Sequence, residues 1–204
     1  PNDAVTKYQA ALRLAPDNIE YKNNLGVALR KVGKLDAAVH IFEEILTLNS
    51  HNTAVQNNLG LAFTQLGRFS EAETAYLSAL NTKPDYSDAS LNLADLYTQV
   101  AAFKKAENCL NQAIVGDIHN SNLLIKLGIV VQKQGRLEEA REILTGALDK
   151  KGSESNSSTA LANVLRDLGE FESAVAILEN LPTQPAEYPG KLANLALIYQ
   201  HQGE

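Results

Sequence analysis

The sequence contains no methionine or tryptophan, only one cysteine and only six prolines in 204 residues. The single cysteine, Cys109, excludes a disulfide within the chain and leaves the redox compartment open. No apolar stretch approaches the roughly 20 residues that a membrane-spanning helix needs, so we expect no transmembrane segment. Because the chain begins at Pro1 and has no methionine, we expect a fragment without its native N-terminus, with the cytoplasm as the favoured compartment.

A basic excess is also missing, and this argues against a nucleic-acid partner. The formal net charge is −6 and the isoelectric point is about 5.3. A nucleic-acid binder needs a basic face that releases counterions from the phosphates. We therefore expect no nucleic-acid partner.

The residues that carry enzyme chemistry are few and scattered. The four histidines, His40, His51, His119 and His201, show no metal-ligand spacing with each other. Cys109 has no neighbouring histidine, and a packing role is the simplest interpretation of it. The sequence therefore predicts no catalytic residues, no metal site and no cofactor.

The periodicity of the apolar residues is typical of helices. Aromatic residues make up 6 % of the chain and apolar residues 45 %. Leu25, Ala28, Leu29 and Val32 show the spacing of one helix face, where a half-buried strand would alternate. This pattern predicts an all-α protein.

A repeat of 34 residues runs through the chain. The tetrapeptide Asn-Asn-Leu-Gly at residues 23–26 returns at residues 57–60. In a 34-residue frame that starts at Ile19, position 7 is always leucine, position 20 is always alanine and position 8 is always small. The position 7 leucines are Leu25, Leu59, Leu93, Leu127, Leu161 and Leu195; the position 20 alanines are Ala4, Ala38, Ala72, Ala106, Ala140 and Ala174.

Each recurring frame position has a physical interpretation. Small residues at positions 8 and 20 allow two helices to approach closely, and the leucine at position 7 fills the space between units. Glycine at position 15, as in Gly33 and Gly67, takes the left-handed conformation that ends a helix. The apolar residue at position 17 opens a second helix, and Ser70 with Glu73 has the spacing of a capping box. Each unit is thus predicted to be a helix, a tight turn, a second helix and a short loop.

This pattern resembles the tetratricopeptide repeat over the whole chain. The resemblance implies a right-handed α-solenoid forming a single array over residues 1–204. The expected units are a half repeat at 1–18, full repeats at 19–52, 53–86, 87–120, 121–154 and 155–188, and a half repeat at 189–204. The chain departs from the family at position 4, which is often aromatic in the family but is Lys22, Gln56, Ser90, Leu124, Ser158 and Leu192 here.

The resemblance also implies a concave groove lined by the first helix of each unit. Asparagine is a poor residue for a helix interior, yet position 6 carries it in four of six units, at Asn24, Asn58, Asn92 and Asn194. We interpret this column as a ladder of amides for the backbone of an extended peptide, similar to the repeat region of O-linked N-acetylglucosamine transferases. The alternative is that these amides bind only water or neighbouring side chains. The expected groove residues are Asn23, Asn24, Asn57, Asn58, Asn92, Lys126, Asn163, Asn194, Arg30, Lys31, Thr64 and Gln65.

The function that we expect is non-catalytic binding of a protein or extended peptide in this groove. Two alternatives stay open: a substrate-recruiting arm of a larger enzyme such as a glycosyltransferase, and head-to-tail self-association through the incomplete end repeats. The carboxylate clamp of chaperone-binding members is disfavoured, because no unit has the required lysine at position 5. Replacing Asn24, Asn58 and Asn92 with alanine is expected to leave helicity and melting nearly unchanged, because alanine is the better helix former.

Overall fold

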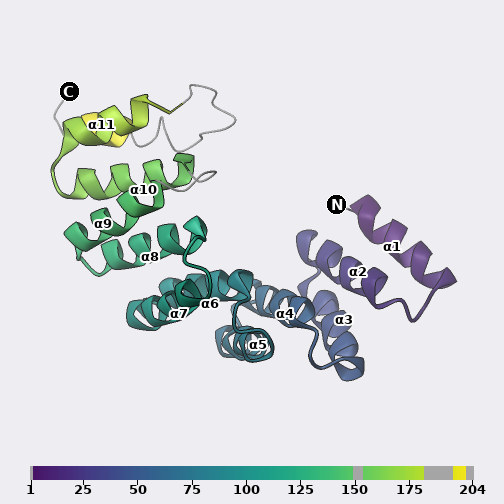
Figure 1. The fold of residues 1–204 in the computed structure, drawn as a ribbon. Coiled ribbons are helices and arrows are strands. Elements are labelled where there is room, and N and C mark those ends of the chain that lie inside the picture. The colour runs from purple at the N-terminus through teal and green to yellow at the C-terminus, as the bar shows by residue number, and fades with distance from the viewer. Residues whose placement is uncertain (1, 149–153, 182–194, 201–204) are drawn as a thin grey trace. The chain divides into compact units, whose positions relative to one another are not determined.

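The protein is helical throughout the part that the structure describes. The computed structural model describes residues 2–148, 154–181 and 195–200, without the side chains of residues 154 and 155. Within these ranges there is no strand (Figure 1). The helices are α1 (Asn2–Leu14), α2 (Ile19–Lys31), α3 (Leu35–Leu48), α4 (Thr53–Gln65), α5 (Phe69–Thr82), α6 (Ser87–Gln99), α7 (Phe103–Gly116), α8 (Ser121–Lys133), α9 (Leu137–Leu148), α10 (Glu154–Asp167) and α11 (Phe171–Glu179), with a short helical segment at 195–200.

The helix boundaries follow the 34-residue frame. The helices α2, α4, α6 and α8 begin at residues 19, 53, 87 and 121, and α3, α5, α7, α9 and α11 begin at residues 35, 69, 103, 137 and 171. The second helices α3, α5, α7, α9 and α11 open with leucine or phenylalanine at position 17, as predicted. The predicted helix-turn-helix period is therefore confirmed.

The chain divides into two compact units, residues 1–100 and residues 101–204. A single array over residues 1–204 stays a prediction. The expected half repeat at 189–204 lies mostly outside the described residues, which include only 195–200 of it.

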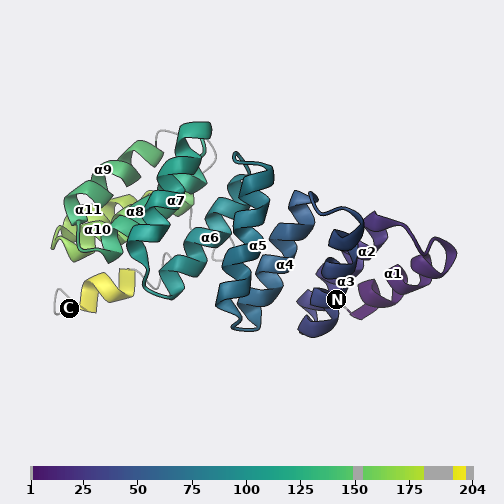
Figure 2. The same cartoon turned by 90° about the horizontal axis from the view of Figure 1, so that it is seen from below.

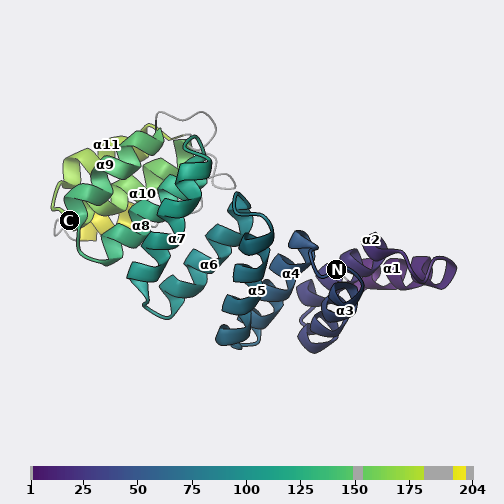
Figure 3. The same cartoon turned by 60° about the horizontal axis from the view of Figure 1, so that its bottom comes forward.

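Within each unit, successive helices pack against each other, and the first helices of neighbouring repeats also touch. In the first unit the helices follow one another in chain order (Figure 2), and α2 also contacts α4 and α4 contacts α6. In the second unit α7 to α11 pack in chain order, and α8 also contacts α10 (Figure 3). The first helices therefore lie side by side and present one continuous face in each unit.

The two helices of a repeat meet where a small residue faces a large one. A Cβ atom added to Gly26 would lie 2.5 Å from the ring of Phe42, and one added to Gly60 would lie 2.5 Å from the ring of Tyr76. At Gly128 the same atom would lie 2.5 Å from Leu144. A larger residue at any of these three glycines would force the facing side chain or the helix to shift, so the predicted close approach is confirmed there.

The turn within each repeat uses a left-handed residue, as predicted. Gly33, Gly67, Gly135 and Gly169 have φ angles between 73° and 81°. Ala101 takes the equivalent place with φ 56° and is the only non-glycine residue with positive φ in the described part of the chain. Its Cβ makes this conformation unfavourable, so Ala101 carries local backbone strain.

The predicted capping box in the second repeat is wrong. Ser70 is the second residue of α5, which begins at Phe69, and the N-cap residue is Arg68, with no side-chain cap. Arg68 instead donates from Nε to Glu71 Oε2 at 2.6 Å. The side chains that do cap helices are those of Asn18, Asn52 and Asn120, which accept from the backbone N–H three residues later at 2.9 to 3.4 Å.

Candidate functional site: an amide face on the first helices

The asparagines of the first unit hydrogen bond to each other across neighbouring repeats. Asn58 Nδ2 on α4 donates to Asn23 Oδ1 on α2 at 3.0 Å. Asn92 Nδ2 on α6 donates in the same way to Asn57 Oδ1 on α4 at 2.9 Å. Both pairs join residues 35 positions apart. We call the surface formed by Asn23, Asn24, Asn57, Asn58 and Asn92 the amide face.

The amide pairs have hydrogen-bonding capacity to spare. A side-chain amide offers two N–H donors and a carbonyl acceptor, and each pair uses one N–H of the later residue and the carbonyl of the earlier one. Asn58 and Asn92 are half-buried, and each keeps its carbonyl and a second N–H. Asn57 is 6 % exposed and is the most enclosed member. Each pair therefore fixes the orientation of the Asn58 or Asn92 amide. The remaining carbonyl and N–H of that amide can still form hydrogen bonds with another group.

Asn24 differs from the other members of the amide face. It is half-buried on α2 and makes no side-chain hydrogen bond within the part of the chain that the structure describes. Among the described residues, it makes no side-chain hydrogen bond to a neighbouring repeat. A substitution of Asn24 therefore tests ligand binding without removing a hydrogen bond between repeats.

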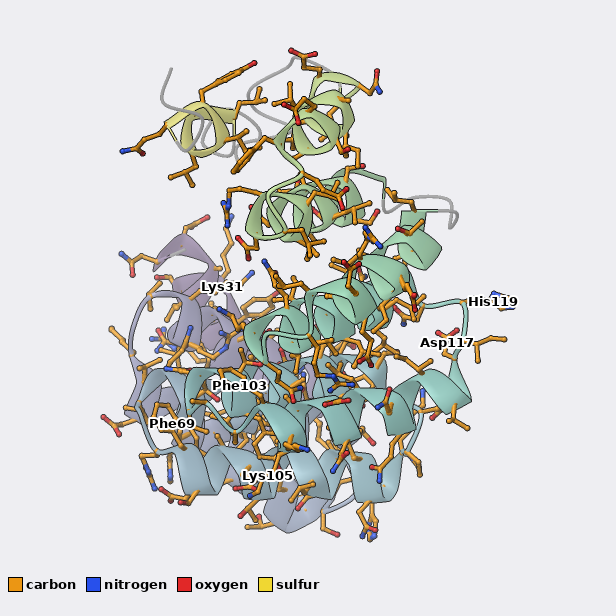
Figure 4. The ribbon with its side chains drawn as sticks, turned by 90° about the vertical axis from the view of Figure 1, so that its left-hand side faces the viewer. Lys31, Phe69, Phe103, Lys105, Asp117 and His119 are labelled. Carbon is orange, nitrogen blue, oxygen red and sulfur yellow. The ribbon has the colours of Figure 1, made fainter. Side chains whose placement is uncertain are left out.

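Basic and hydroxyl side chains stand at the C-terminal ends of α2 and α4. Arg30 is half-buried, and its Nε is enclosed without a hydrogen-bond partner among the described residues. Lys31 is exposed at the end of α2, where Figure 4 labels it. On α4, Thr64 Oγ1 donates to the Gly60 carbonyl at 2.9 Å, and Gln65 is exposed. These residues extend the polar surface beyond the asparagines.

Tyr76 of α5 reaches the same region from the second helix of the repeat. Its hydroxyl lies 3.1 Å from Thr64 Oγ1. Burial raises the pKa of the Tyr76 phenol, while the hydrogen bond with Thr64 and the charge of Arg30 act in the opposite direction. Tyr76 is thus a neutral donor at physiological pH and anchors Thr64.

The second unit uses other side chains for contacts between its first helices. Gln132 Nε2 on α8 donates to Asp167 Oδ2 on α10 at 2.6 Å, again between residues 35 positions apart. Asn163 Oδ1 accepts from Arg166 Nη1 at 3.3 Å. Lys126 is half-buried on α8, and Asn194 lies outside the described residues. Among the described residues, asparagine at position 6 is confined to the first unit, at Asn24, Asn58 and Asn92, and its role as a peptide-binding ladder stays a prediction.

Sequence reasoning missed the role of Gln132 and Asp167 as a pair. The sequence feature that could have revealed this pair is its spacing of 35 residues, which both asparagine pairs share. A residue on one first helix faces the residue 35 positions later, which is one frame plus one residue.

Cys109 lies on α7, and His119 lies in the loop that follows this helix. Burial raises the pKa of the Cys109 thiol to about 11, so the thiol is protonated at neutral pH. His119 projects outward from the loop between α7 and α8, close to Asp117 (Figure 4). The described residues hold no cluster of histidine, cysteine and carboxylate side chains suited to a metal ion. None of the described helices combines the length and apolar character of a membrane span.

Comparison with known proteins identifies the repeat. Two sequence models of the tetratricopeptide repeat match the chain, one at residues 1–53 and 24–87, the other at residues 67–115 and 131–196. No curated protein sequence matches the chain.

Solved structures of tetratricopeptide repeat proteins share the fold. TTC0263 of Thermus thermophilus aligns with 20 % identity and a TM-score of 0.72, over 89 % of this chain and 99 % of that one. A protein of Parabacteroides merdae aligns with 21 % identity and a TM-score of 0.77, over 98 % and 80 %. YrrB, described as having an unusual peptide-binding site, aligns with 15 % identity and a TM-score of 0.64, over 96 % and 97 %.

Proposed function

Because the chain belongs to the tetratricopeptide repeat family, we propose that it is a non-catalytic scaffold that binds an extended peptide across the amide face of its first unit. The observation that carries the proposal is the pair of hydrogen bonds from Asn58 to Asn23 and from Asn92 to Asn57. They fix two amides in neighbouring repeats, each with a free donor and acceptor. An extended peptide backbone offers alternating N–H and C=O groups, which such amides complement without regard to side chains.

Preorganisation supports this function over a purely structural one. Asparagine has poor helix propensity, so a stripe of it must be offset by another interaction. The two pairs explain Asn23, Asn57, Asn58 and Asn92, but they leave Asn24 without a structural partner among the described residues. A ligand that spans the whole face accounts for Asn24 as well. Structures with peptide-binding sites on the same fold, such as YrrB, are consistent with the proposal.

The test uses short linear peptides selected from a random library on the wild-type chain. We expect Asn24→Ala to weaken binding of a selected peptide about five- to tenfold, because one hydrogen bond to the peptide backbone is lost. Melting should be unchanged or slightly higher, since Asn24 has no partner within the described residues. The matched control is Asn108→Ala, an exposed asparagine on the second helix α7. Equal binding by wild type and Asn24→Ala would contradict the proposal.

A further inference from the structure

The first unit contains a pocket on the face formed by its second helices, away from the amide pairs. It has a volume of about 370 Å³ and lies between α3 and α5, over α4. Its walls include Leu46 of α3, Gln56, Leu59 and Phe63 of α4, and Ala75 and Ser78 of α5. The volume falls within the range of roughly 300–1,000 Å³ that is typical of small-ligand sites.

The pocket arises from residues that differ from those of the other repeats. Ala75 stands at position 23 of the frame. Three other repeats carry isoleucine at this position, at Ile41, Ile143 and Ile177. The short side chain of Ala75 therefore leaves open space that isoleucine would fill.

The repeat formed by α2 and α3 carries charged residues at the corresponding frame positions. Residues 34 positions before Gln56 and Ser78 are Lys22 and Glu44, whose side chains form an ion pair. The Lys22 side chain is 14 % exposed and that of Glu44 is 45 % exposed. The repeat of α4 and α5 has the shorter, uncharged Gln56 and Ser78 at these positions, and no ion pair forms between them.

Gln56 is the most buried polar residue that lines the pocket. It is 7 % exposed, and its Nε2 donates to the Ser50 carbonyl at 2.7 Å, which fixes the side-chain amide. Its Oε1 is buried and has no hydrogen-bond partner among the described residues. A buried acceptor without a donor is unfavourable, and a ligand donor that reaches it would relieve this cost.

Among the described residues that line the pocket, none donates to Gln56 Oε1, and the one ionisable residue is paired. Thr74 and Ser78 donate their hydroxyl protons to the backbone carbonyls of Ser70 and Thr74 at 2.9 Å. Glu71, the ionisable residue that lines the pocket, is paired with Arg68, whose guanidinium lies 4.5 Å from the centroid of the Phe63 ring. The site therefore suits a neutral ligand.

We propose that this pocket binds the indole group, a neutral two-ring aromatic with a single N–H donor, and that Gln56 Oε1 accepts from that N–H. Indole nitrogen is a donor only, so the ligand would bring no acceptor into the apolar pocket. A cavity of about 150 Å³ holds benzene, so 370 Å³ accommodates two fused rings. Phe63, which is 5 % exposed, supplies an aromatic neighbour for the rings.

The absence of tryptophan from the chain allows a direct test, because all indole fluorescence comes from the ligand. Indole titrated with the wild-type chain should show a saturable blue shift of its emission. Ala75→Ile should abolish the shift and should fold, since isoleucine occupies this frame position in three other repeats. Benzothiophene has the same shape but lacks the N–H. Its dissociation constant, measured by displacement of indole, should be about fivefold higher than that of indole.

A second measurement does not depend on any variant. Nuclear Overhauser effects between indole protons and the side chains of Phe63 and Leu46 should appear with the wild-type chain. The proposal is overturned if indole gives no saturable shift, if Ala75→Ile binds it equally, or if the Overhauser contacts map to other residues. Competition by N-acetyl-tryptophanamide would identify a tryptophan side chain of a polypeptide as the source, and its failure to compete would identify a free indole compound.

Discussion

Asn58 Nδ2 on α4 donates a hydrogen bond of 3.0 Å to Asn23 Oδ1 on α2, which connects neighbouring repeats through two side-chain amides. The next repeat copies this contact between Asn92 and Asn57 at 2.9 Å. The asparagine column therefore stabilises the contact between repeats and, in the proposed function, also orients the amides that bind a peptide.

The first prediction concerns the energy of this pair. In a double-mutant cycle of Asn23→Ala and Asn58→Ala, the free energy of unfolding should show a coupling of about 0.5–1.5 kcal/mol, the net value of a buried hydrogen bond. Chemical denaturation of the four proteins measures it. Effects that add to within about 0.3 kcal/mol would show that the pair contributes nothing to stability.

The pairs also change what is expected of the triple variant Asn24→Ala, Asn58→Ala and Asn92→Ala. The sequence alone predicts nearly unchanged melting. In the structure two of the three residues donate to a neighbouring repeat, so their loss should outweigh the gain in helix propensity of about 0.5 kcal/mol per residue. The single variant Asn24→Ala is therefore the better test of peptide binding.

The second prediction concerns the close approach of α4 and α5. Gly60→Ala should lower the free energy of unfolding by about 1–3 kcal/mol, because the added Cβ would lie 2.5 Å from the buried Tyr76 ring. Gly146→Ala is the matched control, since nothing lies within 4 Å of its Cβ position in α9. That control should gain up to about 1 kcal/mol from better helix propensity. Equal effects at the two sites would contradict the packing described for Gly60.

The third prediction concerns the strained turn at Ala101. Its φ of 56° is unfavourable for alanine, so Ala101→Gly should raise the free energy of unfolding by about 1 kcal/mol. Thermal and urea unfolding measure the change. Gly67→Ala, at φ 73° with open space around its Cβ, should shift stability by a similar amount in the opposite direction. A destabilised Ala101→Gly variant would show that the turn carries no strain.

The fourth prediction concerns acid stability of the second unit. Hydrogen bonds from Gln134 at 2.7 Å and from Arg136 at 2.9 Å lower the pKa of Glu107. A carboxylate with a lowered pKa in the folded state stabilises the protein above its unfolded pKa, about 4.3, and this contribution is lost as the pH falls through the folded pKa. Glu107→Gln should therefore be less stable than wild type at neutral pH and should approach it in acid. A stability difference that does not change with pH would contradict this account.

Features that repeat along the chain could be predicted from the sequence. The helix starts at Phe69 and Phe103, the left-handed turn at Gly67 and the contact of Gly60 with Tyr76 depend on neighbours within one repeat. These contacts recur every 34 residues, so the columns of the frame report them.

Other features depend on how side chains of different helices are oriented. The contact between Asn23 and Asn58 spans 35 residues, so no column of a 34-residue frame contains both partners. The capping box failed because serine and glutamate with this spacing also occur inside a helix, where Ser70 and Glu73 lie. The pocket beside Gln56 depends on the small size of Ala75, and this matters only once α3 and α5 are known to flank it.

The most direct test of peptide binding by the amide face is the response of the side-chain amide resonances to a selected peptide. In ¹⁵N–¹H spectra of the wild-type chain, the signals of Asn24, Asn58 and Asn92 should shift saturably with the peptide, while that of the exposed Asn108 on α7 should not. Unchanged signals from all three residues while the peptide is bound would contradict the central claim.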